Sequence, residues 1–300
     1  MAYLTVRRCL AAVLGVLLLA TTACQATPPI PPDTAPTTID TTITPTDLQN
    51  FLDNHLTISD HGDFGLDQAQ LITTTDAPGG TMLRINYPAG SASRTAGGPD
   101  GGTQAYLHLP GNPVDTLDLT YQLRFPPNFD FVKGGKLPGL YGGTVTSGQH
   151  IPDGTNGFST RYMWRAHGNA EVYAYLPTSH QHGTSLGRGC WTFTPGQWTT
   201  IRQHTQLNTP GHPDGQITIW QDNKLVFHHT GLEFRTTDQL HIDGLFFSTF
   251  FGGDDTTWAS PTDQYADFAE FTLSTDAAPP PVRTALWSSS SGECETAGDS

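Results

Sequence analysis

The stretch LDLTYQLRF, residues 117–125, alternates apolar and polar side chains without a break. This period of two is the pattern of a β-strand that buries one face and exposes the other. Six further strand-like segments follow, nearly all separated by Gly, Pro, Asn or Asp: 158–165, 171–177, 198–208, 216–223, 244–251 and 265–273. Many short strands joined by turns predict an all-β protein, most simply a jelly-roll sandwich of two antiparallel sheets with a concave groove.

The composition agrees with a turn-rich β protein. The 32 Gly and 23 Pro together outnumber the 14 basic and 28 acidic residues, which excludes coiled coils and helical bundles. The single helical signal is at 47–55. A net charge of −14 repels phosphate backbones, so we expect no nucleic-acid partner.

The chain begins with the layout of a secretory signal, over residues 1–23. Arg7 and Arg8 precede an apolar stretch at 10–20 that ends in small residues. This stretch is too short to span a bilayer, and no later one is apolar enough, so any membrane attachment must be by a lipid. We therefore expect a protein that works outside the cytoplasm.

Cys24 follows directly after this signal, in a context that resembles a lipoprotein cleavage box. Lipidation of Cys24 would hold the protein at the outer face of the cell membrane, whereas ordinary cleavage before it would release a secreted protein. Residues 24–46 are rich in Thr and Pro, which predicts an extended tether. One globular domain is expected over 47–276, followed by a low-complexity tail at 277–300.

Two cysteines remain once Cys9 leaves with the signal and Cys24 carries lipid. In an oxidising compartment Cys190 and Cys294 are expected to form a disulfide that fastens the tail to the domain. The alternative is a buried thiol at Cys190 and a free one at Cys294.

The segments 158–165 and 171–177 predict a hairpin with a polar face. Its odd-numbered side chains share one side of the sheet: Ser159, Arg161, Met163, Arg165, Glu171, Tyr173 and Tyr175. A symmetric turn at 166–170 would place Arg161 opposite Tyr173 or Tyr175. The two tyrosines could instead face a plain solvated surface or the core.

Positive charge gathers around this hairpin although the chain is acidic. Between residues 131 and 190 there are five bases, Lys133, Lys136, Arg161, Arg165 and Arg188, against two acids, Asp153 and Glu171. Such an island suggests an anionic ligand recognised at short range. The competing explanation is that these bases pair with acids from elsewhere in the fold.

The Gly-rich segment FPPNFDFVKGGKLPGLYGG, residues 125–143, predicts a sharply turned backbone that can closely approach a ligand or another strand. It lacks the spacing of a phosphate-binding loop.

Four motifs in this order resemble polysaccharide lyase family 14, the alginate and glucuronan lyases: KGGKLPGLYGG (133–143), FSTRYMWR (158–165), EVYAYLP (171–177) and FSTFFGGDDTTWASPTDQYADF (247–268). The resemblance covers roughly residues 120–273. It implies a β-jelly roll that cleaves an acidic polyuronate by elimination and requires no metal or other cofactor. It also implies catalytic roles for Lys136, Ser159, Arg161, Tyr173 and Tyr175, with Lys133 as a second candidate for the lysine.

Elimination from a uronate removes the C5 proton next to a carboxylate, so a cation must neutralise that carboxylate. We assign this task to Arg161, proton transfer to Lys136 and Tyr175, and positioning to Ser159 and Tyr173; the two tyrosines could exchange roles. The remaining polar residues near this face are candidates for substrate binding: Lys133, Arg165, Arg188, Glu171 and Gln264. The expected partner is an acidic polysaccharide bound by a monomer.

Three other functions fit this sequence less well than elimination. A sugar hydrolase needs two facing carboxylates, and Glu171 could pair only with a distant Asp. His180 and His182 form a His-x-His pattern, but no Glu follows at the spacing of a cupin metal site, which favours a polar loop. Asp254 and Asp255 fit a solvated turn. The main alternative is a non-catalytic carbohydrate-binding module of the same fold, built on exposed tryptophans.

Overall fold

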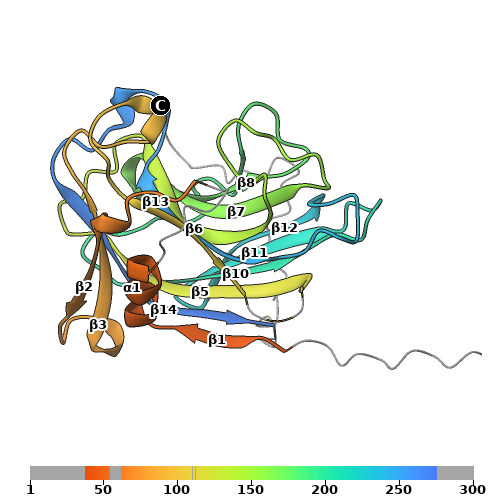
Figure 1. The fold of residues 1–300 in the computed structure, drawn as a ribbon, viewed down its shortest axis with the longest axis horizontal. Coiled ribbons are helices and arrows are strands. Elements are labelled where there is room, and N and C mark those ends of the chain that lie inside the picture. The colour runs from red at the N-terminus through yellow and green to blue at the C-terminus, as the bar shows by residue number, and fades with distance from the viewer. Residues whose placement is uncertain (1–37, 55–61, 110, 112, 276–300) are drawn as a thin grey trace, which may run out of the picture. The chain divides into compact units, whose positions relative to one another are not determined.

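The computed structural model describes residues 38–54, 62–109, 111 and 113–275, which fold as two antiparallel sheets packed face to face (Figure 1). The larger sheet contains β1 (Asp40–Ile43), β2 (Ala69–Thr73), β3 (Thr81–Tyr87), β5 (Thr116–Arg124), β10 (Thr199–Gln206), β11 (Gly215–Gln221), β12 (Lys224–Leu232) and β14 (Gln264–Ser274). The smaller sheet contains β4 (Thr103–His108), β6 (Gly134–Gly143), β7 (Gly157–Arg165), β8 (Ala170–Tyr175), β9 (Thr184–Leu186) and β13 (Gly244–Phe251). The predicted jelly-roll sandwich is confirmed.

The strand orders are β12-β11-β10-β5-β14-β3-β2, with β1 added alongside β14, and β4-β13-β6-β7-β8-β9. The one α-helix of the described ranges, α1 (Pro45–Asn54), matches the helix predicted at 47–55. The described residues also form five short 3₁₀ turns: η1 (Leu66–Gln68), η2 (Pro78–Gly80), η3 (Arg94–Ala96), η4 (Ala166–Gly168) and η5 (Thr256–Trp258). None of the helices in the described ranges is long and apolar enough to cross a membrane.

The core lies between the two sheets and is rich in aromatic rings. Tyr121 of β5 meets Tyr162 of β7 edge-on, with ring centroids 6.1 Å apart. Trp164, also on β7, packs its ring 5.3 Å from that of Phe251. Because the even-numbered residues of β7 face this core, its odd-numbered residues face the other side of the smaller sheet.

The Gly-rich segment differs from its prediction. Only residues 125–133 turn, whereas Gly134–Gly143 is the central strand β6, paired with β13 and β7. The glycines are needed for close packing: a Cβ on Gly135 would lie 2.1 Å from the Trp164 ring, and one on Gly139 would lie 2.3 Å from the Thr160 carbonyl oxygen. The prediction that this segment closely approaches another strand is therefore correct. The prediction of a sharply turned backbone is wrong for residues 134–143.

The folded region begins before residue 47, the boundary that composition predicted. β1 lies within the stretch expected to be a tether, and it pairs with β14 from Asp40 opposite Ser274 onward. Thr44 and Asp47 then start α1 as a capping box: the Thr44 hydroxyl accepts the Asp47 N–H at 3.1 Å, and the Asp47 carboxylate accepts the Thr44 N–H at 3.0 Å. The signal at 1–23 and the tail at 277–300 lie outside the described residues.

Candidate active site

The β7–β8 hairpin brings the predicted catalytic residues to one face of the smaller sheet. Arg161 pairs with Tyr173, and Ser159 pairs with Tyr175. Lys136 enters from the neighbouring strand β6, whose register sets it opposite Met163. The prediction that Arg161 lies opposite one of the two tyrosines is confirmed.

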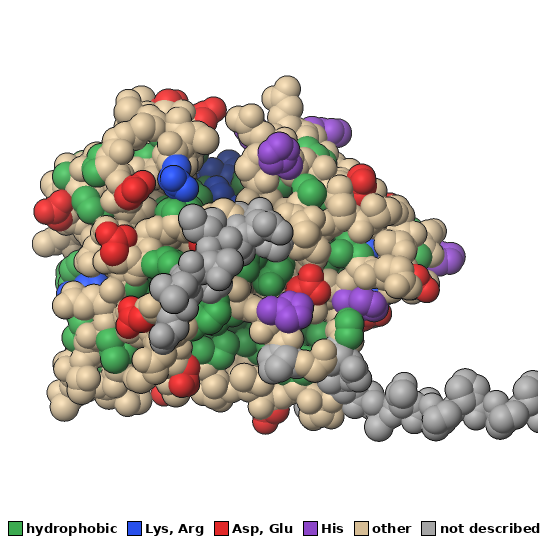
Figure 2. All heavy atoms as spheres, viewed as in Figure 1, with side chains coloured by type: hydrophobic (Ala, Val, Ile, Leu, Met, Phe, Trp, Pro, Cys, Tyr) green, Lys and Arg blue, Asp and Glu red, His purple; other side chains and the backbone are tan. Residues whose placement is uncertain are grey.

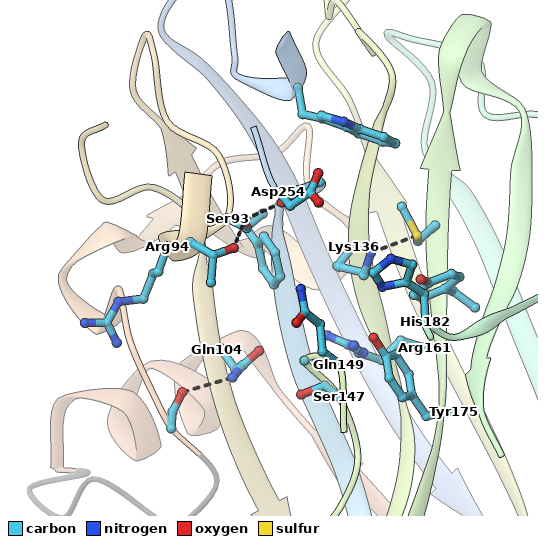
Figure 3. Close-up of a pocket in the computed structure, with 18 of the residues that line it drawn as sticks. Ser93, Arg94, Gln104, Lys136, Ser147, Gln149, Arg161, Tyr175, His182 and Asp254 are labelled. Carbon is cyan, nitrogen blue, oxygen red and sulfur yellow. Dashed lines mark hydrogen bonds between the residues drawn. The ribbon is translucent and has the colours of Figure 1, made fainter. Parts of the chain in front are cut away.

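A cavity of about 480 Å³ opens over this face. Its sheet wall is formed by Lys136, Arg161, Met163, Arg165, Tyr173 and Tyr175. In Figure 3, Ser93, Arg94 and Asp254 lie across the cavity from Lys136, Arg161 and Tyr175. Figure 2 shows a hollow at the top of the molecule with Lys and Arg side chains inside it. A cavity of this volume is in the range that binds small ligands, with cations at its base.

Lys136 is buried in an apolar setting, with only 9% of its surface exposed. Its Nζ atom donates a hydrogen bond to Met163 Sδ at 2.9 Å and lies 4.3 Å from the centroid of the Tyr173 ring. Burial, with the nearby charges of Arg161 and Arg165, holds the pKa of Lys136 well below the usual lysine value, although Glu171 opposes this. Lys136 can therefore carry a neutral amine that accepts a proton.

Arg161 is buried at the base of the cavity, with 2% of its surface exposed. One Nη atom donates to the Ser248 hydroxyl at 3.1 Å, while the buried Nε atom has no hydrogen-bond partner. Its guanidinium carbon lies 4.4 Å from the centroid of the Phe246 ring. Within the described ranges, neither Arg161 nor Lys136 forms an ion pair with a carboxylate. A buried guanidinium with an unused N–H is a site for an anion.

Tyr173 and Tyr175 stand side by side, with ring centroids 5.7 Å apart in an edge contact. Burial, reinforced by Tyr175, raises the pKa of Tyr173 to about 12, so Tyr173 remains a protonated phenol at neutral pH. The segment that leads into β9 packs behind both rings: a Cβ on Gly183 would lie 2.8 Å from Tyr173 and 2.9 Å from Tyr175. The two phenols thus present hydrogen-bond donors on a closely packed support.

The arginines predicted for substrate binding are engaged with Glu171. Arg165 Nε donates to one Glu171 oxygen at 2.9 Å, and Arg188 Nε donates to the other at 2.6 Å. Arg165 lines the cavity, whereas Arg188 and the fully buried Glu171 do not. These two arginines do pair with an acid, but it is Glu171 of the island itself and not an acid from elsewhere in the fold, as the competing explanation expected.

Three other predicted residues also do not line the cavity. The buried Ser159 hydroxyl donates to the Thr146 carbonyl at 2.6 Å. Gln264 lies in the larger sheet, where its amide joins the Asp130 backbone to Ser260. Lys133 is exposed in the turn before β6 and lies 5.7 Å from the Trp258 ring centroid, so it reaches only the rim.

Several cavity residues were missed because they come from loops, where no alternating pattern marks which side chains share a face. His182 belongs to the His-x-His pattern for which we predicted a polar loop, and it lines the cavity from the β8–β9 loop, two residues before β9. Asp254 was assigned to a solvated turn; its neighbour Asp255 does make that turn, but Asp254 itself faces the cavity. Arg94 and Gln149 carried no sequence signal at all.

In the described part of the chain, no three His, Cys, Asp or Glu side chains are grouped to hold a metal ion. Cys190 is disulfide-bonded and packs against the core. Cys24 and Cys294 lie outside the described residues, so lipidation of the first and pairing of the second with Cys190 stay predictions.

Comparison with known proteins gives concordant matches. The family model for polysaccharide lyase 14 matches residues 75–271. The crystal structure of a marine alginate lyase of this family from Aplysia kurodai is 31% identical, with a TM-score of 0.68 over 81% of this chain and 100% of that one. A search of curated proteins finds no match.

Two more distant structures share the fold. Alginate lyase Aly36B is 21% identical, with a TM-score of 0.62 over 78% of this chain and 96% of that one. The endo-β-1,4-glucuronan lyase of the fungus Trichoderma reesei is 12% identical, with a TM-score of 0.50 over 75% and 94%. With the family match over most of the folded region, these findings show that the chain belongs to polysaccharide lyase family 14 and is a polysaccharide lyase.

Proposed function

We propose that this lyase cleaves an acidic polyuronate, alginate or glucuronan, by β-elimination at the cavity over β6, β7 and β8. The observation that carries the proposal is the pair formed by Lys136 and Arg161. Both are buried in the cavity wall, and neither has a carboxylate partner in the described ranges. Lys136 can be neutral, whereas Arg161 stays charged, so an anion from the substrate would supply the missing partner of Arg161.

The chemical step starts with the C5 proton of the uronate, which is acidified by the neighbouring carboxylate. The neutral amine of Lys136 takes this proton, the C5–H electrons form a C4=C5 double bond, and the C4–O4 bond breaks. Tyr175 returns a proton to O4 of the leaving sugar. The reaction balances without an oxidant, a reductant or added water.

Arg161 supports this step by neutralising the carboxylate. Negative charge moves onto that group as the C5 proton leaves, and a fixed guanidinium in a poorly solvated site stabilises it strongly. Arg161 also lies 5.9 Å from the centroid of the Tyr175 ring, close to the proposed proton donor. Tyr173, whose ring lies over Lys136 Nζ, positions the amine.

The neighbours support the choice of substrate class. The Aplysia kurodai enzyme is an alginate lyase, and variants of Aly36B have been crystallised with alginate tri- and tetrasaccharides. The Trichoderma reesei enzyme acts on glucuronan. A polymer with one carboxylate on every ring fits the cationic base of the cavity.

The test is incubation of the purified protein with polymannuronate, polyguluronate and glucuronan, with carboxyl-reduced polymannuronate as the neutral control. Elimination creates a conjugated double bond, so ultraviolet absorbance should rise with at least one acidic polymer and not with the neutral one. Binding of an acidic polymer without any rise in absorbance would contradict the proposed chemistry and favour the non-catalytic carbohydrate-binding module.

We further propose, from the sequence, that residues 1–23 direct export and that a lipid on Cys24 holds the lyase at the outer face of the cell membrane, where it acts as a monomer. Cys24→Ser should release the enzyme from the membrane fraction into the medium, and light scattering should give the mass of one chain. An unlipidated mature N-terminus in mass spectrometry would contradict the anchor.

A further inference from the structure

We infer that Gln149 is a substrate-binding residue whose side-chain amide holds the uronate carboxylate together with Arg161. This inference rests on the proposed function. Gln149 lies in the loop between β6 and β7 and lines the cavity. Figure 3 shows its amide pointing into the cavity beside Arg161.

The backbone of Gln149 adopts a conformation that glutamine rarely takes. Its φ is 65°, directly after Gly148 at 74°, so two consecutive residues are left-handed. Glycine or asparagine would fit the second position with less strain. Of the six non-glycine residues with positive φ in the described ranges, Gln149 is the one that lines the cavity. A strained residue in a binding site is a signal that its side chain is needed there.

The base of this loop is fixed by two buried side chains. The Thr146 carbonyl accepts the Ser159 hydroxyl at 2.6 Å, and the Thr146 hydroxyl forms a 2.7 Å hydrogen bond with Tyr106. Ser159 therefore acts as a positioning residue, holding the loop three residues before Gln149. The backbone that leads to the amide is held at Thr146, so binding has mainly the exposed Gln149 side chain to order.

The hydrogen-bonding capacity at this point of the cavity is unused. No hydrogen bond engages the Gln149 side chain within the described ranges, and the buried Nε of Arg161 has no partner. A carboxylate offers two oxygens that accept several hydrogen bonds. One oxygen fits the guanidinium of Arg161, and the second fits the N–H of the Gln149 amide.

The test separates binding from turnover by using a Lys136→Ala background, in which substrate stays intact. Calorimetry should measure the affinity of a mannuronate and a glucuronate tetramer before and after adding Gln149→Gly, which removes the amide and eases the backbone. Loss of a hydrogen bond to a charged group should weaken binding about 10- to 100-fold. Gln149→Glu should weaken it further, because the new carboxylate repels the ligand, whereas Gln149→Asn should keep part of the affinity.

Two controls isolate the carboxylate. A carboxyl-reduced tetramer should bind the Lys136→Ala protein and its Gln149→Gly derivative equally. Asn223→Gly changes a left-handed residue in the β11–β12 turn and should leave affinity unchanged. The inference would be overturned if Gln149→Gly left the affinity for the acidic tetramers unchanged. It would also be overturned if Gln149→Gly weakened binding of the reduced tetramer as much as binding of the acidic ones. In both cases the wild-type enzyme would still make unsaturated product, so the proposed function would stand. If the Lys136→Ala protein binds no acidic tetramer and the wild type makes no unsaturated product, both the proposed function and this inference are wrong.

Discussion

The Nζ atom of Lys136 lies 2.9 Å from the Sδ atom of Met163, so a lysine at the base of the cavity donates to a thioether and not to a carboxylate. A thioether is a weak acceptor and compensates poorly for the water that Lys136 loses on burial. The same burial that costs stability therefore supplies a neutral amine for catalysis.

Lys136→Met should abolish turnover and raise the free energy of unfolding by about 1 to 2 kcal/mol. The pKa of Lys136 is lowered in the folded state, so the unfolded chain binds more protons between that lowered value and the ordinary 10.5. The free energy of unfolding of the wild type should therefore rise with pH between these two pKa values. The difference in this free energy between Lys136→Met and the wild type should be largest at pH values below that range. Urea unfolding at several pH values checks this, with the exposed Lys133→Met as control. A variant less stable than wild type at every pH would contradict the burial argument.

Met163→Leu should move the acidic limb of the kcat/KM profile to lower pH. The thioether favours the protonated amine slightly, and its removal leaves Lys136 in a more apolar site, which lowers the pKa further. The loss in kcat should stay below about tenfold, because packing volume is conserved. A pH-rate profile beside that of Met82→Leu, a buried methionine on β3, gives the comparison. A limb that moves to higher pH would show that Met163 acts in another way.

Tyr175→Phe should lower kcat by at least about 100-fold, because the phenol that returns a proton to O4 is lost. Tyr173→Phe keeps the ring over Lys136 and should cost only about tenfold, the effect expected for one hydrogen bond. Steady-state kinetics on the preferred polymer measures both. The reverse order of the two losses would transfer the donor role to Tyr173.

Glu171→Gln should destabilise the protein by about 3 kcal/mol, because breaking a buried ion pair leaves the Arg165 charge without a full partner. Arg188→Gln is the matched control: the Arg188 side chain is 47% exposed, and its loss should cost less than about 1 kcal/mol. Thermal and chemical unfolding measure the two changes. Equal costs for both variants would show that Glu171 stabilises the fold through contacts other than Arg165.

Gly183→Ala should lower kcat by about tenfold or more with little change in melting temperature. The added Cβ would come within 2.8 to 3.0 Å of the two tyrosine rings, and small displacements of catalytic groups are costly. Gly211→Ala, in the loop between β10 and β11, has open space around its Cβ but a strained φ, so it separates backbone strain from ring displacement. Unchanged kcat in Gly183→Ala would show that the rings can shift without loss.

The strands and the central hairpin were predictable because alternation in β5 and β7 records directly which side chains face the core. The same rule placed Arg161 and the two tyrosines on one face. It failed for β6, where glycines that allow Trp164 to pack closely look like turn residues in the sequence. Alternation also could not show that Ser159 and Glu171, although on the correct face, form hydrogen bonds with Thr146 and the arginines and do not line the cavity. The contacts with Thr146 and Arg188 come from loops, which carry no period, and alternation shows that Arg165 and Glu171 share a face but not that they pair.

The pairing of β1 with β14 decides how mechanical load would enter this domain. A pull on the chain before Asp40 acts first on a four-residue strand whose strand pairing, among the described residues, is with β14 of the larger sheet. That ladder would peel one pair at a time, while β6, β7 and β8 belong to the other layer and receive no direct force. Force applied at the N-terminal end would thus separate β1 from β14 first. The strands that carry the catalytic residues would keep their geometry under that tension.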